Sequence, residues 1–386
     1  MKPDEIAPTD DSAEHERPAA APPEHASRGI RTLHVARRVL LFAVAMFVFI
    51  LAIQLMKTGA KPLSARLSEG FFPFNNAVST LGVGMVLAYL TLSGKPVAVL
   101  ALTFFATGGI SRLEAFTMLS GGRLGAAFIV LLVGFLYSRR GDHRRESLGM
   151  GILALSLTAL VYVPGMMIGY GVLKSGALSH IDLTSGNVSS VVDLVWGRVV
   201  TWFGNVLPSP ALVVVGVLLI IVAIKLLDRV LPEMDGERQA RSNGSRFKRP
   251  WTMFLFGSVV TLITQSVSVS LTVLVPLAAK GYVKRGEAIP YIMGANVTTL
   301  ADTLLFAIVV GNVVGIQIVL AEFIGVLTVT VLCLLFLYQP IQRLVVGLDE
   351  WVVSSGRRLT LFVVGLFVFP GLLMLSGVFI GHPLPH

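Results

Sequence analysis

Long apolar runs separated by short polar or basic connections dominate the chain. A helix needs roughly 20 residues to cross the hydrocarbon core of a bilayer, and seven of the runs approach or exceed that length. These runs lie at 39–56, 116–137, 148–173, 210–227, 288–310, 314–337 and 359–380. The pattern therefore predicts an all-α polytopic membrane protein with seven spans.

Two further apolar segments, 75–107 and 254–279, are interrupted near their middle. Ser93-Gly94-Lys95-Pro96 breaks the first and Gln265-Ser266-Val267-Ser268 breaks the second. Each arm is too short to cross alone, so we predict re-entrant hairpins whose free backbone groups are satisfied by protein or by water in a cavity. One kinked, full-length helix in each place is the alternative interpretation.

The remaining segments are more polar. The first 36 residues lack apolar periodicity and begin with a stretch rich in Pro, Ala and acidic residues, which predicts a disordered cytoplasmic tail rather than a signal peptide. The stretch 191–207 places Asp193 and Arg198 beside Trp196 and Trp202, a pattern that favours an interfacial helix over a span.

Composition and charge agree with a lipid environment. Of the 386 residues, 54% are hydrophobic and 14% are charged, a balance that favours burial in lipid. The formal charge of +9 lies largely in connections between the apolar runs, where Lys and Arg orient helices, so we expect no nucleic-acid partner. The basic clusters predict a cell-membrane protein with a cytoplasmic N-terminus. The single cysteine, Cys333, excludes an intramolecular disulfide and a thiolate metal cluster.

The two halves of the chain resemble each other at a constant offset. Glu114 aligns with Glu287 because 287 − 114 = 173, and the same offset carries Gly84, Ser93, Gly108 and Gly121 onto Gly257, Ser266, Gly281 and Gly294. We predict two inverted repeats, each made of a span, a re-entrant hairpin and a span, with extra peripheral helices. Chance similarity between segments rich in Leu, Val and Gly is the alternative.

This repeat divides the chain into five parts. They are the tail 1–36, membrane repeat 1 at 37–137, a connecting span and interfacial helix at 138–209, membrane repeat 2 at 210–311, and C-terminal spans at 312–386.

Motifs in the second half resemble those of a known family. Gly257, Thr261 and Gln265-Ser266-Val267-Ser268, followed by Gly294-Ala295-Asn296-Val297-Thr298-Thr299, are similar to the signatures of the type II sodium/phosphate cotransporter family. The resemblance covers about 39–337 and is specific in the second repeat. It implies that two hairpin tips meet near the centre to coordinate sodium and phosphate.

The first half departs from the family pattern. Leu92 stands where the family has Gln, Lys95 stands opposite Ser268, and Arg123 stands opposite Asn296. These departures leave the substrate and the sodium coupling open.

Polar residues around both breaks form the predicted substrate or ion site. Hydroxyl and amide groups can replace water around a small cation or an oxyanion, although in lipid they also join helices or bond back to their own helix. The predicted set is Ser93, Lys95, Arg123, Gln265, Ser266, Ser268, Ser270, Asn296, Thr298, Thr299 and Asp302. A sodium ion would lie at Gln265, Ser266, Ser268 and Thr299.

Four charged residues fall inside apolar segments: Lys95, Arg123, Asp302 and Glu322. A charge at the middle of an inserted helix costs roughly 2.5–3.5 kcal/mol, so these residues should face a cavity or one another. Our hypothesis is that Lys95 stands in for one sodium ion, while Arg123 either holds the anion or pairs with Asp302. In the alternative interpretation both bases extend toward the interface.

The sequence therefore predicts a secondary active transporter of inorganic phosphate or a similar small oxyanion, coupled to sodium ions or protons. A sodium-independent transporter of another solute and a membrane assembly factor on the same scaffold are the alternatives. The histidines lie in tails, loops or near interfaces, which argues against an enzyme, and we expect no organic cofactor. The oligomeric state stays open.

Overall fold

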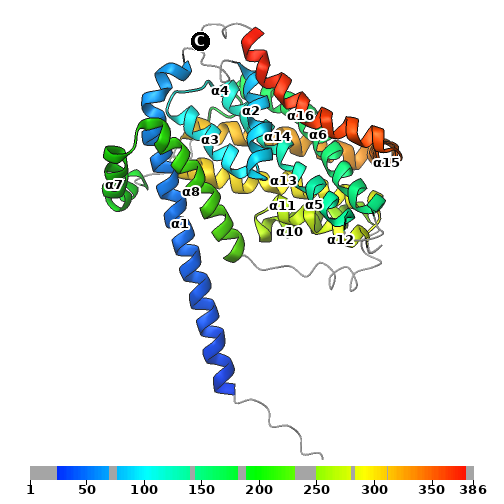
Figure 1. Ribbon diagram of the computed structural model, residues 1–386, viewed down its shortest axis with the longest axis horizontal. Coiled ribbons are helices and arrows are strands. Elements are labelled where there is room, and N and C mark those ends of the chain that lie inside the picture. Colours follow the sequence, from blue (N-terminus) through cyan, green and yellow to red (C-terminus); the bar gives the residue numbers. More distant parts are fainter. Residues whose placement is uncertain are drawn as a thin grey trace, which may run out of the picture.

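The computed structural model of the protein describes residues 24–68, 76–139, 144–180, 188–230, 249–279, 283–310 and 312–379. Within these ranges the chain forms helices and no strands (Figure 1). The helices are α1 Glu24–Ser68, α2 Ala77–Thr91, α3 Lys95–Ala106, α4 Arg112–Ala126, α5 Phe128–Ser138, α6 Arg144–Ser175, α7 Val188–Val206, α8 Ser209–Val230, α10 Pro250–Thr264, α11 Val267–Thr272, α12 Leu274–Ala279, α13 Arg285–Val310, α14 Val313–Phe336, α15 Tyr338–Val353 and α16 Gly356–Phe379.

Seven segments of the described chain are long and apolar enough to cross a membrane. They are Val39–Pro62, Arg112–Ser138, Arg145–Ser175, Ser209–Leu226, Arg285–Val310, Val313–Phe336 and Gly356–Gly377. Each one overlaps a predicted span, so the prediction of seven apolar spans in an all-helical protein is confirmed by length and composition.

The helix α1 begins earlier than the sequence analysis predicted. It starts at Glu24, inside the segment 1–36 that we predicted as a disordered tail. Pro22 and Pro23 precede it and the next proline is Pro62, so no helix-breaking residue separates the polar start from the apolar span. The rest of the predicted tail, 1–23, lies outside the described residues.

The two interrupted segments form short helices with a break between them. The break between α2 and α3 contains Leu92 with φ 53°, and the break between α10 and α11 contains Gln265 with φ 46°. Both residues are in the left-handed region, which residues other than glycine seldom adopt. The two strained positions differ by 265 − 92 = 173, the offset of the sequence repeat.

Two amphipathic helices lie outside the spans. The helix α7 contacts α1, where Trp196 Nε1 donates a hydrogen bond of 3.0 Å to the Phe47 carbonyl oxygen. The sequence analysis did not predict α15, which buries Ile341, Val345 and Val352 on one face while most of its remaining surface is exposed. Positions four and seven residues apart share a helix face, which explains this pattern.

Glycines allow the long helices to approach closely. A Cβ atom on Gly257 of α10 would lie 2.2 Å from the Tyr291 carbonyl oxygen of α13. A Cβ atom on Gly294 of α13 would lie 2.1 Å from the Phe254 carbonyl oxygen of α10. Only hydrogen fits at these positions, so the backbones of α10 and α13 are in direct contact.

The contact between α2 and α4 repeats this arrangement. A Cβ atom on Gly84 would lie 2.2 Å from the Met118 carbonyl oxygen, and one on Gly121 would lie 2.2 Å from the Leu81 carbonyl oxygen. Each of these four residues precedes its counterpart in α10 and α13 by 173 positions, for example 257 − 84 = 173 and 291 − 118 = 173.

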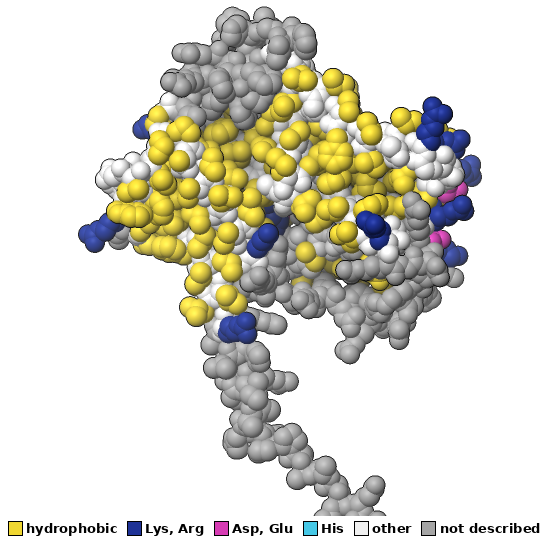
Figure 2. Space-filling model, viewed as in Figure 1, with side chains coloured by type: hydrophobic (Ala, Val, Ile, Leu, Met, Phe, Trp, Pro, Cys, Tyr) yellow, Lys and Arg dark blue, Asp and Glu magenta, His cyan; other side chains and the backbone are white. Residues whose placement is uncertain are grey.

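Apolar side chains cover much of the described outer surface, as Figure 2 shows for one face. On α16, for example, Leu361, Phe367 and Leu372 are more than half exposed. Such a continuous apolar exterior is unusual for a water-soluble monomer and fits contact with lipid. Among these helices, α6 packs along α14 and α1 packs along α8 (Figure 1).

We expect Gly294→Ala to destabilise the protein by about 1–3 kcal/mol, because the added methyl group must push α13 away from α10. Gly171→Ala is the matched control, since nothing lies within 4 Å of a Cβ atom at that helical position. Thermal unfolding in detergent measures both. Equal midpoints for the two variants would contradict the close contact.

Candidate functional site

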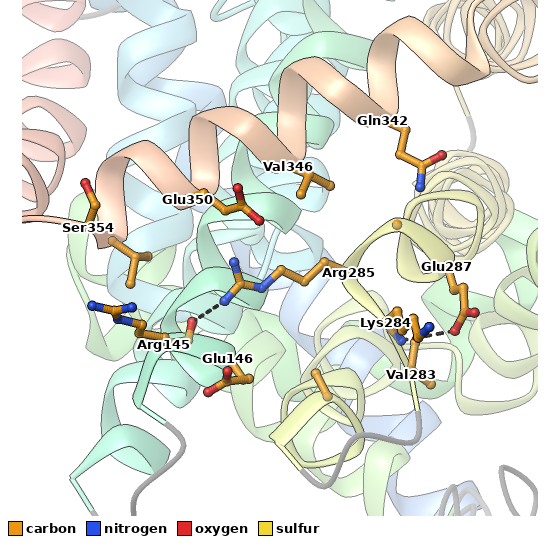
Figure 3. A pocket seen from close by; sticks show the side chains of 13 residues that line it. Arg145, Glu146, Val283, Lys284, Arg285, Glu287, Gln342, Val346, Glu350 and Ser354 are labelled. Carbon is orange, nitrogen blue, oxygen red and sulfur yellow. Dashed lines mark hydrogen bonds between the residues drawn. The ribbon is translucent and has the colours of Figure 1, made fainter.

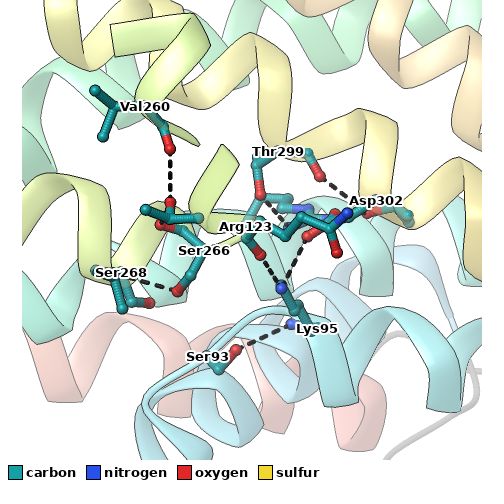
Figure 4. A network of polar contacts seen from close by, with 12 residues as sticks. Ser93, Lys95, Arg123, Val260, Ser266, Ser268, Thr299 and Asp302 are labelled. Atoms are coloured by element: carbon teal, nitrogen blue, oxygen red, sulfur yellow. Dashed lines mark hydrogen bonds and ion pairs between the residues drawn. The ribbon is translucent and has the colours of Figure 1, made fainter. Parts of the chain in front are cut away.

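The two helix breaks contact each other through reciprocal bonds. Lys95 Nζ donates to the Gln265 carbonyl oxygen, and Ser268 Oγ donates to the Leu92 carbonyl oxygen at 3.4 Å. Figure 4 shows Lys95 and Ser268 on the two breaks. Since 268 − 95 = 173 and 265 − 92 = 173, each bond is the counterpart of the other. Each break therefore supplies a side-chain donor for the carbonyl group that the opposite break leaves free.

Local hydrogen bonds shape both breaks in the same way. Thr91 Oγ1 donates to the Leu87 and Ser93 carbonyl oxygens, each at 2.8 Å. Its counterpart Thr264 donates to the carbonyl oxygens of Val260 at 2.8 Å and of Ser266 at 3.4 Å. These hydroxyls satisfy carbonyl groups near the end of each helix.

Past each break, a serine hydroxyl accepts from the backbone of the helix that follows. Ser93 Oγ accepts from the Lys95 backbone N–H at 3.4 Å, and Ser266 Oγ caps α11 by accepting from the Val269 N–H at 3.3 Å. Ser266 is thus occupied as a helix cap.

A buried cluster of three charges adjoins this contact. Asp302 of α13 lies between two bases: its Oδ2 is 3.2 Å from Lys95 Nζ, and its Oδ1 is 3.6 Å from Arg123 Nη2. Lys95, Arg123 and Asp302 are 8%, 3% and 7% exposed, so water screens their interactions little. Of the two partners that the hypothesis left open for Arg123, Asp302 is present.

Two hydroxyl groups complete this cluster. Arg123 Nη1 donates to Thr299 Oγ1 at 3.0 Å, and Thr303 Oγ1 donates to Asp302 Oδ1 at 3.1 Å. Thr299, Asp302 and Thr303 lie on one face of α13 at helical spacing. The side chains of Lys95, Arg123, Thr299, Asp302 and Thr303 form what we name the Asp302 cluster.

Glu322 of α14 lies deeper in the protein. It is fully buried, and neither of its carboxylate oxygens has a hydrogen-bond partner among the described residues. Arg123 of α4 attracts its charge electrostatically. The second carboxylate is therefore linked to the Asp302 cluster through Arg123.

Three predicted site residues have partners that belong to helix packing. Ser270 is fully buried between Thr261 Oγ1 at 2.8 Å and Tyr291 OH at 2.9 Å. The other two residues bond to α6 and to their own helix: Asn296 Nδ2 donates to Thr158 Oγ1 at 3.0 Å, and Thr298 Oγ1 donates to the Gly294 carbonyl oxygen at 2.9 Å. These contacts hold α10, α11 and α13 in position around the cluster.

The predicted sodium ligands have different partners from one another. The Gln265 side chain is exposed, and its carbonyl group accepts from Lys95. Ser266 caps α11, Ser268 bonds to Leu92, and Thr299 accepts from Arg123.

Sequence reasoning missed the role of two groups. The Leu92 carbonyl oxygen is part of the contact, and its position opposite Gln265 in the repeat was a usable signal. Tyr162 of α6, whose hydroxyl donates to the Asn296 carbonyl oxygen at 3.0 Å, lies in an apolar span that carries no such signal.

Comparison with known proteins adds a family. Residues 219–348 match the model of the Na+/Pi-cotransporter family. This part of the chain, about a third of its length, is similar to that family. The resemblance found in the second half of the sequence is thereby confirmed, and the family is one of transporters rather than enzymes, as predicted. No curated protein and no solved structure matches the chain.

The boundaries of the matched segment 219–348 divide the site. Gln265, Ser268 and Asp302 lie inside the matched residues, whereas Lys95 and Arg123 lie before them. The two bases that surround Asp302 thus come from the part of the chain that the family model leaves unmatched.

A separate pocket of about 800 Å³ lies beside α15 (Figure 3). Its lining mixes basic and acidic side chains, and it includes none of the Asp302 cluster. Arg285 Nη1 lies 2.7 Å from the buried Asp349 Oδ2, and Arg285 Nη2 donates to the Arg145 carbonyl oxygen at 2.7 Å. Because its lining includes no residue of the contact between the two breaks, this pocket is the weaker candidate for a transport site.

We expect Asp302→Ala to destabilise the protein by about 3–5 kcal/mol, because it leaves Lys95 and Arg123 buried without their carboxylate. Glu322→Gln should cost less, since the carboxylate that it removes accepts no hydrogen bond. Thermal unfolding in detergent compares the two variants. A larger loss for Glu322→Gln would mean that the wrong carboxylate has been assigned to the bases.

A second expectation concerns pH. Burial raises the pKa of Asp349 to about 6, although the Arg285 guanidinium opposes the change. In the unfolded chain an Asp carboxyl titrates near pH 4. Because the folded protein holds this proton more tightly, protonation of Asp349 stabilises the folded state fully below about pH 4, and this stabilisation is lost as the pH rises through about 6.

The variant Asp349→Asn lacks this titration. The unfolding midpoint of Asp349→Asn minus that of the wild type should therefore increase between pH 4 and pH 7. Ser354→Ala, which removes an exposed hydroxyl that does not titrate from the same pocket, is the control and should show no such trend. A constant difference for Asp349→Asn would contradict the raised pKa.

Proposed function

We propose that the protein is a secondary active transporter of inorganic phosphate or a similar small oxyanion, located in the cell membrane with a cytoplasmic N-terminus. The substrate site lies between the two helix breaks. One observation carries this proposal: Lys95 and Arg123, from separate helices, converge on the carboxylate of Asp302 beside the contact between the breaks.

The chemistry of the cluster suits an oxyanion. A carboxylate is itself an oxyanion, so a position that holds Asp302 between an ammonium and a guanidinium group has the charge and the donors that phosphate needs. A guanidinium offers paired N–H donors in a fixed plane, and an ammonium supplies a compact positive charge. The Thr299 hydroxyl lies 3.0 Å from Arg123 Nη1, and the Ser268 hydroxyl lies at the contact between the breaks, so both can add further donors.

The start of α3 adds to the positive potential. This helix begins at Lys95 with Pro96 in its first turn, and Gly94 provides no side-chain cap. The amino end of a helix carries a partial positive charge, which favours a bound anion.

We further propose that the two halves are inverted repeats and that the interrupted segments are re-entrant hairpins. The recurring contacts support this, because a two-fold relation between halves makes each contact occur twice with partners exchanged. The bonds from Lys95 to Gln265 and from Ser268 to Leu92 are such a pair. Broken helices at a repeat interface are typical of secondary transporters.

Uptake by proteoliposomes tests the function. Purified full-length protein should accumulate labelled phosphate, with sodium present or replaced by choline. Uptake of neither phosphate nor another tetrahedral oxyanion would favour a transporter of a different solute or an assembly factor.

We expect Arg123→Met and Ser268→Ala each to reduce uptake at least about tenfold, since losing a hydrogen bond to a charged group costs about 1.5–3 kcal/mol. Lys225→Gln is the control, because this exposed lysine of α8 lies outside the Asp302 cluster. Uptake is compared at equal amounts of reconstituted protein. Undiminished uptake by both site variants would remove the break contact from the mechanism.

A further inference from the structure

The Asp302 cluster is already occupied by an anion of the protein itself. Asp302 Oδ2 lies against Lys95, and Asp302 Oδ1 lies against both Arg123 and Thr303. Both carboxylate oxygens are thus directed to groups that a bound oxyanion would need. An incoming anion must displace Asp302 from at least one of the two bases.

We propose that Asp302 is a tethered competitor of the transported oxyanion and carries the coupled proton, so that the substrate binds with one proton taken up by Asp302. This inference rests on the proposed function. No covalent bond of the substrate changes: a proton from solvent binds a carboxylate oxygen, and the neutral acid releases Lys95 and Arg123.

Charge balance in a buried site gives the reason. Lys95 and Arg123 carry two positive charges, which a doubly charged phosphate balances only if Asp302 is neutral. If Asp302 stayed ionised, two anions would lie side by side in a region of low dielectric constant, where like charges disfavour each other strongly. Proton uptake removes that repulsion.

The groups around Asp302 agree with this assignment. Its charged and titratable neighbours among the described residues are Lys95 from α3, Arg123 from α4 and Tyr162 from α6. Glu322 from α14 acts on Arg123 and on Tyr162. The Tyr162 hydroxyl donates its proton in a hydrogen bond to the Asn296 carbonyl group. Asp302 is the acid that contacts both bases directly.

The same geometry disfavours a sodium ion at this point. A monovalent cation placed between Lys95 and Arg123 would meet two fixed positive charges. A proton on Asp302 supplies the same unit of positive charge without occupying space between the bases.

Binding of inorganic phosphate to the purified full-length protein in sodium-free buffer tests the inference. Calorimetry in two buffers of different ionisation enthalpy, between pH 5.5 and pH 8.5, counts the protons taken up with each phosphate. Comparison with Asp302→Asn cancels the titration of phosphate itself. We expect the wild type to take up about one proton more per phosphate than Asp302→Asn.

The affinity should change in parallel. Without the competing carboxylate, Asp302→Asn should bind phosphate at least about tenfold more tightly than the wild type at pH 8. The wild type should approach the affinity of the variant as the pH falls, by up to about tenfold per pH unit for one linked proton.

Two further variants separate the possible outcomes. Glu322→Gln should still take up the additional proton when phosphate binds. If Asp302→Asn does not fold, Asp302→Glu is used instead; it retains a titratable acid and should also take up the additional proton. Loss of the proton in Glu322→Gln, or phosphate binding by the wild type with no proton beyond the titration of phosphate, would overturn the inference. Absence of any phosphate binding by the wild type would instead contradict the proposed function on which the inference rests.

Discussion

The central constraint in this protein is that two helices break inside an apolar bundle. Each break leaves a backbone carbonyl group without a partner in its own helix, at Leu92 and at Gln265, and an unsatisfied carbonyl group in a bundle surrounded by lipid is costly. The opposite break provides the missing donor in both cases, through Lys95 and Ser268. The two halves of the chain are therefore hydrogen-bonded to each other at the two points where the helical hydrogen bonds within each half are interrupted.

Lys95 connects the contact between the two breaks with the Asp302 cluster. The same ammonium group donates to the Gln265 carbonyl oxygen and lies against the Asp302 carboxylate. Its counterpart Ser268 has no charge, so the two breaks are alike in geometry and different in electrostatics. The segment 219–348, which matches the Na+/Pi-cotransporter family, supplies the carboxylate, and the preceding half supplies both bases. Two of the departures from the family pattern, Lys95 and Arg123, thus lie together beside Asp302.

Much of the architecture could be predicted from the sequence. The spans are readable because lipid demands about 20 consecutive apolar residues, and the breaks are readable because Lys95 and Gln265 interrupt such runs. The offset of 173 predicted which residues would be equivalent, and it recurs in the contacts of Gly84 and Gly257. The helix α15 was missed because a half-exposed helix between two spans has no run of spanning length.

The partners of the polar side chains depended on tertiary structure. The sequence does not distinguish a hydroxyl or amide side chain that binds a ligand from one that joins two helices. Ser270 and Asn296 therefore resembled ligand-binding residues, but in the structure they bond to Tyr291 and Thr158. The sequence by itself determined the spans, the breaks and the four charges that had to be buried. Which charge faces which was decided only by packing, because Lys95, Arg123 and Asp302 come from three helices whose relative rotation no local pattern specifies.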